Sequence, residues 1–544
     1  MNRARHLRNY DMHSWTGIAL GFFVFIVSLS GCFALFHEEL HTWEDASRRL
    51  PTVESSISIG PIYEDFVAEV SEGKTITSTS IDTPNELEPY FSGYVYMQDE
   101  DGKFESESRR WDPATGDILP ERAEGAAYWL LVFHQDLMWP DALGGRTAGR
   151  SLVGVAGVIL MLALISGVVA HTKIFEELFT LRYWRSVRLK WQDTHKVVGL
   201  WGLPFFAMIS FTGAILGIVA ILAPITAVVA FKGNTEALIE KVIGTPPQAI
   251  GVEAEMLPLD DFIQKAHPES GEIPGRIIVS HYGDEAATYN LLYRADSKLT
   301  TYESETFSAV TGEQVYNRQF DASSPGSRVT GAISPLHYGT YGGEHGSVGS
   351  IGLKLVYFIL GLALAIITAM GNMMWIERRL HGNDGSKSEA FYRRLSKLNV
   401  GLTTAMGFAS ISVLYVDKLY GGVEASRMFW VGWTYFAVWI GFIIYALCRE
   451  NEYRTTREIL ALTGFAAMGV PLLNGVVTAD PFWLALFSGH RASAWVDVIC
   501  LLAGTLTCLV AWRLPDTRPE KKKVRKKKLP LDAQEEDVAL APAE

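Results

Sequence analysis

Apolar stretches long enough to cross a bilayer alternate with charged stretches along this 544-residue chain. A bilayer core of about 30 Å requires about 20 apolar residues in a helix. Eight stretches have this length and predict a mainly α-helical membrane protein with eight transmembrane helices, at residues 15–36, 151–170, 197–231, 355–375, 398–416, 428–448, 459–479 and 492–512. The third stretch is longer than a span requires and contains Pro204 and Pro224.

The distribution of Lys and Arg predicts the orientation, because cationic loops are retained in the cytoplasm. Segments 171–196 and 376–397 each carry six Lys or Arg, whereas segments 417–427 and 476–497 carry two and one. Both termini are therefore expected in the cytoplasm of a bacterium whose inner membrane holds the protein. The expected organisation is span 1–36, periplasmic insertion 37–150, span 151–171, cytoplasmic loop 172–196, span 197–230, periplasmic insertion 231–354, span 355–375, cytoplasmic loop 376–397, four spans within 398–512 and a cytoplasmic tail 513–544.

Composition excludes several classes of protein. The net charge is −12, which argues against a nucleic-acid partner, and the segregated hydropathy excludes a soluble enzyme. The chain has 4 Cys, none in a CxxC pair, so thiolate zinc sites, iron–sulfur clusters and disulfide scaffolds are excluded. The basic run at 521–528 is interpreted as a topology anchor that touches anionic membrane lipid, rather than as a nucleic-acid patch.

The N-terminus has a second interpretation. Arg3, Arg5 and Arg8, an apolar run and the segment Leu29-Ser30-Gly31-Cys32 also resemble a lipoprotein signal peptide. The apolar run continues to Phe36, and the segment has an internal copy, so we favour a membrane span.

The internal copy is visible in the polar residues of the first and third spans. Asp11, His13 and Gly17 open the first span, and the same pattern of Asp193, His195 and Gly199 opens the third, 182 residues later. At the same spacing, Ser30-Gly31 corresponds to Thr212-Gly213.

The two long loops repeat as well. Each contains a helix-like stretch, at 62–70 and 259–266, alternating strand-like runs, and a strand that runs into a Thr-Gly turn, at 115–116 and 311–312. Each then re-enters the membrane through a histidine, His134 or His337. Residues 1–175 and 183–380 are interpreted as two copies of one unit, in which a small α+β insertion joins two spans. The last four spans lack this unit.

The repeat predicts two pairs of facing histidines. Pseudo-twofold symmetry places His13 against His195 at the cytoplasmic ends of spans one and three, and His134 against His337 in the periplasmic layer. Facing helices of a bundle commonly hold cofactors, and two opposed imidazoles can clamp one haem iron. We therefore expect two b-type haems in the first four-helix bundle. Helix caps and a zinc site are the alternatives, although zinc prefers ligands gathered at one point.

The other histidines have weaker support from the pattern. His171 closes the second span on the cytoplasmic side and is a further candidate ligand, as is His345 in a Gly-rich loop. Six further histidines lack repeat support and are expected at the surface: His37, His41, His267, His281, His381 and His490. Gly17, Gly31, Gly199 and Gly213 permit close approach, either of helices or of a flat macrocycle. No catalytic residue is assigned.

These motifs resemble the PepSY-associated transmembrane family, in which His-x-x-x-Gly opens a span, a Thr-Gly turn lies in the ectodomain and a His precedes the following span. The matching residues are His13, Gly17, Thr115, Gly116, His134, His195, Gly199, Thr311, Gly312 and His337. The resemblance covers roughly residues 1–380 and implies PepSY-like insertions, haem bound by boundary histidines and activity as an inner-membrane ferrisiderophore reductase. The four extra spans depart from the shorter members.

The expected reaction is one-electron reduction of Fe(III) in a periplasmic siderophore or similar ferric chelate, because hard oxygen ligands hold Fe(III) better than Fe(II). The cytoplasmic loops contain no Rossmann, P-loop or flavin-type motif, so an external cytoplasmic or quinone donor must supply electrons. Two alternatives remain: a transporter of iron or siderophore, and a PepSY-bearing membrane anchor that regulates a periplasmic partner.

Overall fold

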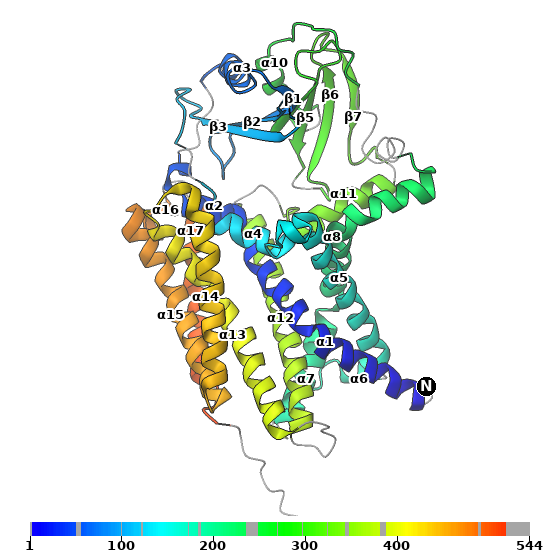
Figure 1. Ribbon diagram of the computed structural model, residues 1–544, viewed down its shortest axis with the longest axis vertical. Coiled ribbons are helices and arrows are strands. Elements are labelled where there is room, and N and C mark those ends of the chain that lie inside the picture. Colours follow the sequence, from blue (N-terminus) through cyan, green and yellow to red (C-terminus); the bar gives the residue numbers. More distant parts are fainter. Residues whose placement is uncertain are drawn as a thin grey trace, which may run out of the picture.

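Eight long helices run side by side, and a β-sheet lies across one end of them in the computed structural model (Figure 1). We call this the sheet-side end of the bundle. The structure describes residues 3–50, 56–99, 101–120, 123–171, 173–182, 187–234, 248–268, 270–295, 298–323, 325–342, 347–380, 388–487 and 491–517. The tail cations at 521–528, together with His345, His381 and His490, lie outside these residues.

Eight of the described helices are long and apolar enough to cross a membrane, which confirms the predicted number. They are α1 (Arg3–Ala34), α5 (Gly145–Ala170), α8 (Leu203–Phe231), α12 (Val348–Leu380), α13 (Glu389–Leu419), α14 (Arg427–Cys448), α15 (Glu452–Thr478) and α17 (Arg491–Arg513). Shorter elements join them: α2 (His37–Glu44), η1 (Ala46–Arg48), α4 (Ala126–Asp136), η2 (Asp141–Leu143), α6 (Ile174–Glu177), α7 (Val187–Trp201), α11 (Pro325–Tyr338), η3 (Glu424–Ser426) and α16 (Phe482–Ala485).

The third predicted span is two helices, which explains its excess length. α7 ends at Trp201 and α8 begins at Leu203, with Pro204 in its first turn, where a missing N–H costs nothing. A Cβ atom on the intervening Gly202 would overlap the Phe206 ring. The chain therefore bends at a position that only glycine fits. Pro224 lies inside α8.

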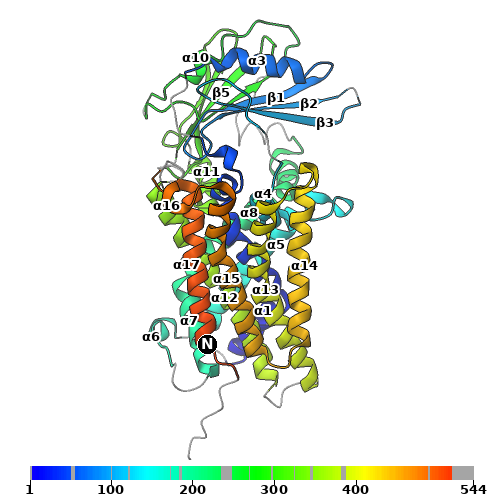
Figure 2. The ribbon, with the colours of Figure 1, turned by 90° about the vertical axis from the view of Figure 1, so that its left-hand side faces the viewer.

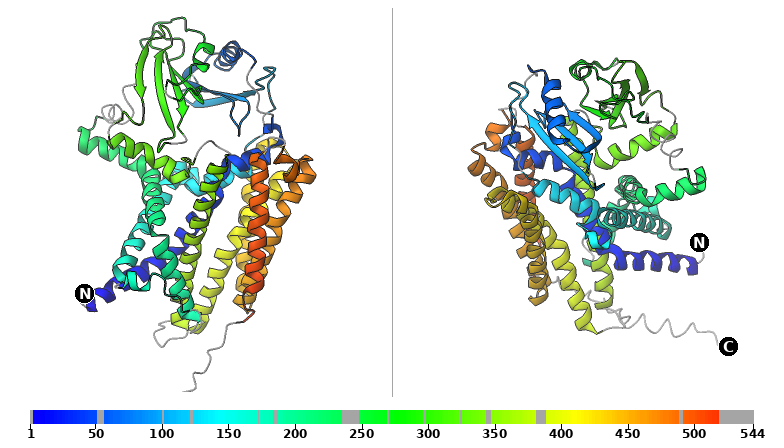
Figure 3. Two further views of the ribbon diagram at one scale, coloured as in Figure 1. Left: turned by 180° about the vertical axis from the view of Figure 1, so that it is seen from behind. Right: turned by 45° about the horizontal axis from the view of Figure 1, so that its top comes forward.

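The first bundle consists of α1, α5, α8 and α12, with α7 packed against α12 (Figure 3). α1 packs against both α5 and α12, and α5 packs against α8. Small residues allow the closest approach: a Cβ atom on Gly154 of α5 would lie 2.8 Å from the backbone of Gly217 in α8. Such contacts let helices associate where no hydrophobic effect drives them together.

The second bundle consists of α13, α14, α15 and α17, beside α12 (Figure 2). α13 packs against α14 and α15, and α15 packs against α17. The backbones of Gly464 in α15 and Gly504 in α17 touch, because a Cβ atom on either residue would lie within 2.8 Å of the other's carbonyl oxygen. The α2 helix contacts α17 at the sheet-side end, so the insertion at residues 37–150 begins against the second bundle.

The strands of the two insertions form one antiparallel sheet of seven strands. The first insertion gives β1 (Thr75–Asp82), β2 (Phe91–Gln98) and β3 (Phe104–Trp111), and the second gives β4 (Arg276–Ser280), β5 (Thr288–Arg294), β6 (Tyr302–Ser308) and β7 (Gln314–Arg318). The order is β3-β2-β1-β4-β5-β6-β7. β1 pairs with β4, with Thr79 opposite Val279 and Asp82 opposite Arg276. The two predicted α+β insertions are thus one continuous layer.

One face of the sheet is covered by α3 (Ile59–Val70) and α10 (Asp260–Ile263), on the side away from the helices of the bundle (Figure 2). Tyr63, Phe66 and Phe262 bury their rings against alternate residues of the strands. Both predicted Thr-Gly turns are present, with Gly116 at φ +78° and Gly312 at φ +76°. The left-handed backbone explains why glycine occupies both turns.

Candidate functional site: two histidine pairs in the first bundle

The structure brings the four repeated histidines together as two pairs. His13 of α1 and His195 of α7 have ring centres 6.3 Å apart, with their ring planes at 71°. His134 of α4 and His337 of α11 have ring centres 6.3 Å apart as well, with planes at 17°. The His134 pair lies at the sheet-side end and the His13 pair lies toward the opposite end. We call them the sheet-side pair and the far pair.

In the far pair, each ring is held by a backbone carbonyl of the adjacent span. His13 Nδ1 lies 3.0 Å from the carbonyl oxygen of Ala163, and His195 Nδ1 lies 2.9 Å from that of Ile367. Ser166 Oγ adds a contact of 3.3 Å to His13 Nδ1. A carbonyl accepts only, so Nδ1 carries the proton and Nε2 carries the lone pair in the neutral ring. This is the tautomer that binds a metal through Nε2.

In the sheet-side pair, the small residues of the repeat hold the rings. Ser30 Oγ and the Val27 carbonyl oxygen each lie 3.1 Å from His134 Nδ1, and Thr212 Oγ1 lies 3.0 Å from His337 Nδ1. The Ser30 and Thr212 hydroxyls donate to carbonyls of their own helices, so they accept from the imidazoles. Nδ1 is again the protonated nitrogen. Burial lowers the pKa of His134 to about 4 and that of His337 to about 3, so both rings are neutral.

Glycines provide the space in which each imidazole sits. A Cβ atom on Gly31 would lie 2.9 Å from His134 Cε1, and one on Gly213 would lie 2.9 Å from His337 Cε1. The corresponding distances are 3.2 Å from Gly167 to His13 and 3.4 Å from Gly371 to His195. Two of these four glycines, Gly31 and Gly213, were singled out by the repeat.

The other two predicted glycines behave differently. Gly17 and Gly199 lie one turn after His13 and His195, and a Cβ atom on either would meet no atom of the described chain within 4 Å. Helix packing therefore does not require glycine there. Of the two sequence-based explanations, close approach of a flat macrocycle fits these positions better than helix contact.

The residues present fit a haem at each pair. A metal–imidazole bond is about 2 Å long, so two rings that would hold one metal ion between them must have their centres several ångströms apart. The observed separation is 6.3 Å in both pairs. Nδ1 of each of the four imidazoles has a hydrogen-bond acceptor. Such a bond on the nitrogen that does not bind the metal orients a histidine ligand and raises its basicity. Among the described residues, the one cluster of three or more His, Cys, Asp or Glu lies elsewhere, so these residues add no third ligand to either pair.

A buried amide on α12 faces α1, because a Cβ atom on Gly21 would lie 2.6 Å from Asn372 Oδ1. Asn372 follows Gly371 on α12, is 1% exposed and has no hydrogen-bond partner for either amide atom among the described residues. Leaving a buried polar group unpaired costs about 1–3 kcal/mol. Asn372 is therefore a candidate for contact with a bound polar group, and nothing in the sequence pattern distinguished it.

The structure places the remaining predicted histidines as follows. His171 is the C-cap of α5, four residues beyond Gly167, and its role as a ligand stays a prediction. His345 lies outside the described residues. The expectation of a surface position is wrong for His267, which is 2% exposed and packs on the Tyr293 ring at 4.8 Å.

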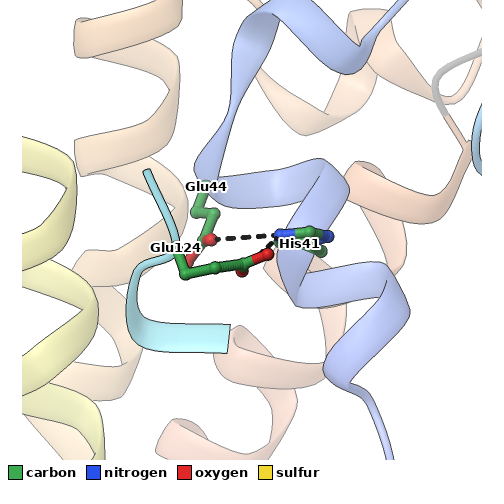
Figure 4. Close-up of side chains that lie close together, drawn as sticks. All are labelled: His41, Glu44 and Glu124. Atoms are coloured by element: carbon green, nitrogen blue, oxygen red, sulfur yellow. Dashed lines mark hydrogen bonds and ion pairs between the residues drawn. The ribbon is translucent and has the colours of Figure 1, made fainter. Parts of the chain in front are cut away.

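Sequence reasoning also missed a cluster of His41, Glu44 and Glu124 at the sheet-side end (Figure 4). His41 was expected only at the surface, without a role. The signal was the His-x-x-Glu spacing of His41 and Glu44, which places both on one face of a helix. Glu124 is remote in sequence and joins them only through the fold.

The fold defines a multi-pass α-helical membrane protein with a β-sheet at one end. The model of the PepSY-associated TM region matches residues 10–378, and the chain belongs to this family. A relative in Pseudomonas aeruginosa, the uncharacterized protein PA4219, is 26% identical over 373 residues, which cover 67% of this chain and 90% of the relative. The second bundle lies beyond the matched range.

Proposed function

We propose that this protein is a transmembrane electron carrier that binds two haems and reduces a ferric chelate, such as a ferric siderophore, outside the inner membrane. His13 and His195 would hold one haem, and His134 and His337 the other. The observation that carries the proposal is the shared geometry of the two pairs, each with 6.3 Å between ring centres and with Nδ1 bound to an acceptor.

The positions of the pairs support an electron path across the bilayer. His13 and Ser30 lie on the same helix, and Ser30 contacts His134. Seventeen residues at about 1.5 Å each separate the two levels by about 25 Å along α1. This is close to the roughly 30 Å of a bilayer core. The far pair is then near the cytoplasmic face, where an external cytoplasmic or quinone donor delivers electrons.

The chain's own residues have three roles in this proposal. The imidazoles would hold the haem iron, and the acceptors on Nδ1 fix the tautomer and the ring orientation. The glycines beside the rings leave room for ligands and macrocycle. A haem held by two histidines supplies one-electron transfer between its ferric and ferrous states.

In this proposal, the ferric chelate is reduced at the sheet-side pair. Oxygen chelators hold Fe(III) much better than Fe(II), so one electron weakens the complex and leaves the chelator intact. The sheet covers this end of the bundle (Figure 1). Both termini are cytoplasmic in this proposal, with the sheet in the periplasm.

The test is an optical spectrum with haem stoichiometry on protein purified from haem-replete cells. We expect b-type bands in the reduced-minus-oxidised spectrum and two haems per chain. His13→Ala and His337→Ala should each remove one haem, and the double variant should remove both. His281→Asn is a matched control, because His281 lies in the sheet domain at φ +54°, which Asn tolerates. Colourless wild-type protein contradicts the proposal.

A second measurement separates reduction from transport. With a soluble reductant inside proteoliposomes and ferric chelate outside, the reductase releases Fe(II) outside, and the chelator stays there. Accumulation of intact chelate inside vesicles that lack a reductant would instead identify a transporter.

A further inference from the structure

Three side chains that can bind a metal lie close together outside the two histidine pairs. They are His41, Glu44 and Glu124, here called the His41 cluster. His41 and Glu44 project from α2, and Glu124 lies two residues before α4 (Figure 4). His41 Nε2 is 3.0 Å from Glu124 Oε2 and 3.8 Å from Glu44 Oε1. One ligand atom from each residue lies within 4.8 Å of the other two.

Two of the three side chains are held in place by the fold. The Glu44 side chain is 2% exposed, and its Oε2 accepts a hydrogen bond of 2.9 Å from the backbone N–H of Ala127. His41 lies one turn earlier on the same helix and is 21% exposed. Glu124 is 46% exposed and faces solvent. The cluster thus has a rigid buried side and an open side through which an ion can enter.

The charges around the cluster favour a cation. Glu44 and Glu124 are two carboxylates beside one imidazole. The nearest guanidinium, of Arg427, is 4.0 Å from Glu44 Oε1, but Asp417 binds it at 2.7 Å and offsets its charge. Arg48, which also lies near Glu124, is engaged by Asp45 and Glu88, each at 3.4 Å.

We propose that the His41 cluster binds a divalent transition-metal cation. One imidazole nitrogen and two carboxylate oxygens form a mixed donor set that suits Fe(II), Mn(II) and Zn(II). Bonds of about 2.1 Å place neighbouring donor atoms about 3–4 Å apart, which requires little movement of these side chains. The cation replaces the proton that His41 Nε2 and Glu124 share, and water completes its coordination on the open side.

The location connects this site to the proposed reaction. Glu124 precedes the helix that carries His134, so the His41 cluster and the sheet-side pair are at the same end of the bundle. Fe(II) released from a reduced chelate would emerge on this side. The choice of Fe(II) as the natural ion rests on the proposed function, whereas divalent-cation binding does not.

The test is titration of Mn(II) into untagged, EDTA-treated full-length protein, followed by the paramagnetic resonance signal of free Mn(II). We expect one bound Mn(II) per chain, displaced by Zn(II), which binds such sites more tightly. Glu124→Gln and His41→Ala should each weaken binding at least about tenfold. Glu72→Gln, which changes an exposed carboxylate of the sheet domain, should bind as the wild type does.

His337→Ala separates the two proposals. If it loses a haem and retains Mn(II) affinity, both sites are present and independent. If wild-type protein is colourless and still binds Mn(II) through Glu124, the proposed function fails and the cation site stands. An unchanged free-Mn(II) signal with the wild type, or equal affinity of E124Q, H41A and E72Q, overturns the cation site.

Discussion

The two bundles place polar groups inside the membrane region in different ways. The first bundle has a buried ion pair at its sheet-side end, between Lys354 of α12 and Glu39 of α2 at 2.6 Å. Its other distinctive polar groups are the imidazoles on α1 and α7 and on the adjoining α4 and α11, each with Nδ1 bound by a neighbouring helix. The second bundle contains full charges that pair with one another or with the segment around α2. Asp417 binds Arg427 at 2.7 Å, and Asp497 accepts hydrogen bonds from Trp43 and Asn474, each at 2.7 Å.

This difference indicates what the second bundle contributes. Its buried charges face the segment from Trp43 to Arg49. The Arg49 guanidinium donates hydrogen bonds to Asn474 Oδ1 at 3.0 Å and to Asp480 Oδ2 at 3.2 Å. The same segment adjoins the His41 cluster and the first strands of the sheet. The second bundle therefore positions the sheet-side end, whereas the first bundle contains the candidate redox site. Stability and haem content should respond to changes in different bundles.

The largest expected effect is on stability, from Arg427→Ala in the second bundle. Arg427 is 1% exposed, and its loss leaves the carboxylates of Asp417 and Glu44 buried without their cation. Breaking a buried ion pair from one side costs about 3–5 kcal/mol. We expect a clearly lower unfolding temperature in detergent, with two haems per chain in the protein that remains folded.

Arg454→Ala is the matched control for this change. Arg454 pairs with Glu458 at 3.0 Å on the surface of α15 and is 64% exposed, so its loss costs less than about 0.5 kcal/mol. Loss of haem from folded R427A protein would show that the two bundles do not divide the roles as argued here.

Asp497→Asn should have a smaller effect on stability. The two carboxylate oxygens accept from Trp43 Nε1 and Asn474 Nδ2, and an amide can accept at only one of these positions. The other donor then faces an N–H group, at a cost of about 1–3 kcal/mol. The measurement compares the thermal unfolding temperatures of D497N and of the control Thr505→Ala, which removes only a hydroxyl that is bonded within α17. Equal unfolding temperatures would contradict the role assigned to Asp497.

Much of the first bundle could be predicted because it is duplicated. Hydropathy predicts the spans, and repetition separates His13, His134, His195 and His337 from nine other histidines. Ser30 and Thr212 were visible only as small residues before glycine, yet they bind the imidazoles of the sheet-side pair.

Features that depend on contacts between distant segments could not be predicted. The joining of β1 to β4 merges the two insertions, but an edge strand's partner is not encoded in its own alternation. Ala163 and Ile367 act through backbone carbonyls, so their side chains carry no signal. The second bundle has no internal copy, so no repeated motif indicated that Asp417 and Arg427 form an ion pair.

Within the first bundle, Gly31→Ala and Gly17→Ala should differ. The added methyl group at residue 31 would lie 2.9 Å from His134 Cε1 and push the ring from its position, whereas at residue 17 it meets no protein atom within 4 Å. Overpacking of this kind costs about 1–3 kcal/mol. We expect G31A to lose the sheet-side haem and keep the far one, as judged by haem stoichiometry. If G17A perturbs the spectrum without changing the unfolding temperature of haem-free protein, the macrocycle lies against that helix face.

The smallest expected effect comes from the hydroxyls that accept from Nδ1. Ser30→Ala and Thr212→Val each remove one such acceptor. His134 Nδ1 keeps the Val27 carbonyl oxygen as an acceptor, whereas His337 Nδ1 has no second acceptor among the described residues. Loss of the hydrogen-bond partner of a ligating imidazole weakens metal affinity about 10–100-fold. T212V should therefore release its haem more readily than S30A, with both unfolding near the wild-type temperature. Ser412→Ala, which removes a hydroxyl bonded within α13 of the second bundle, should change neither quantity. Identical haem retention in T212V, S30A and S412A would mean that the ring orientation is fixed by packing alone.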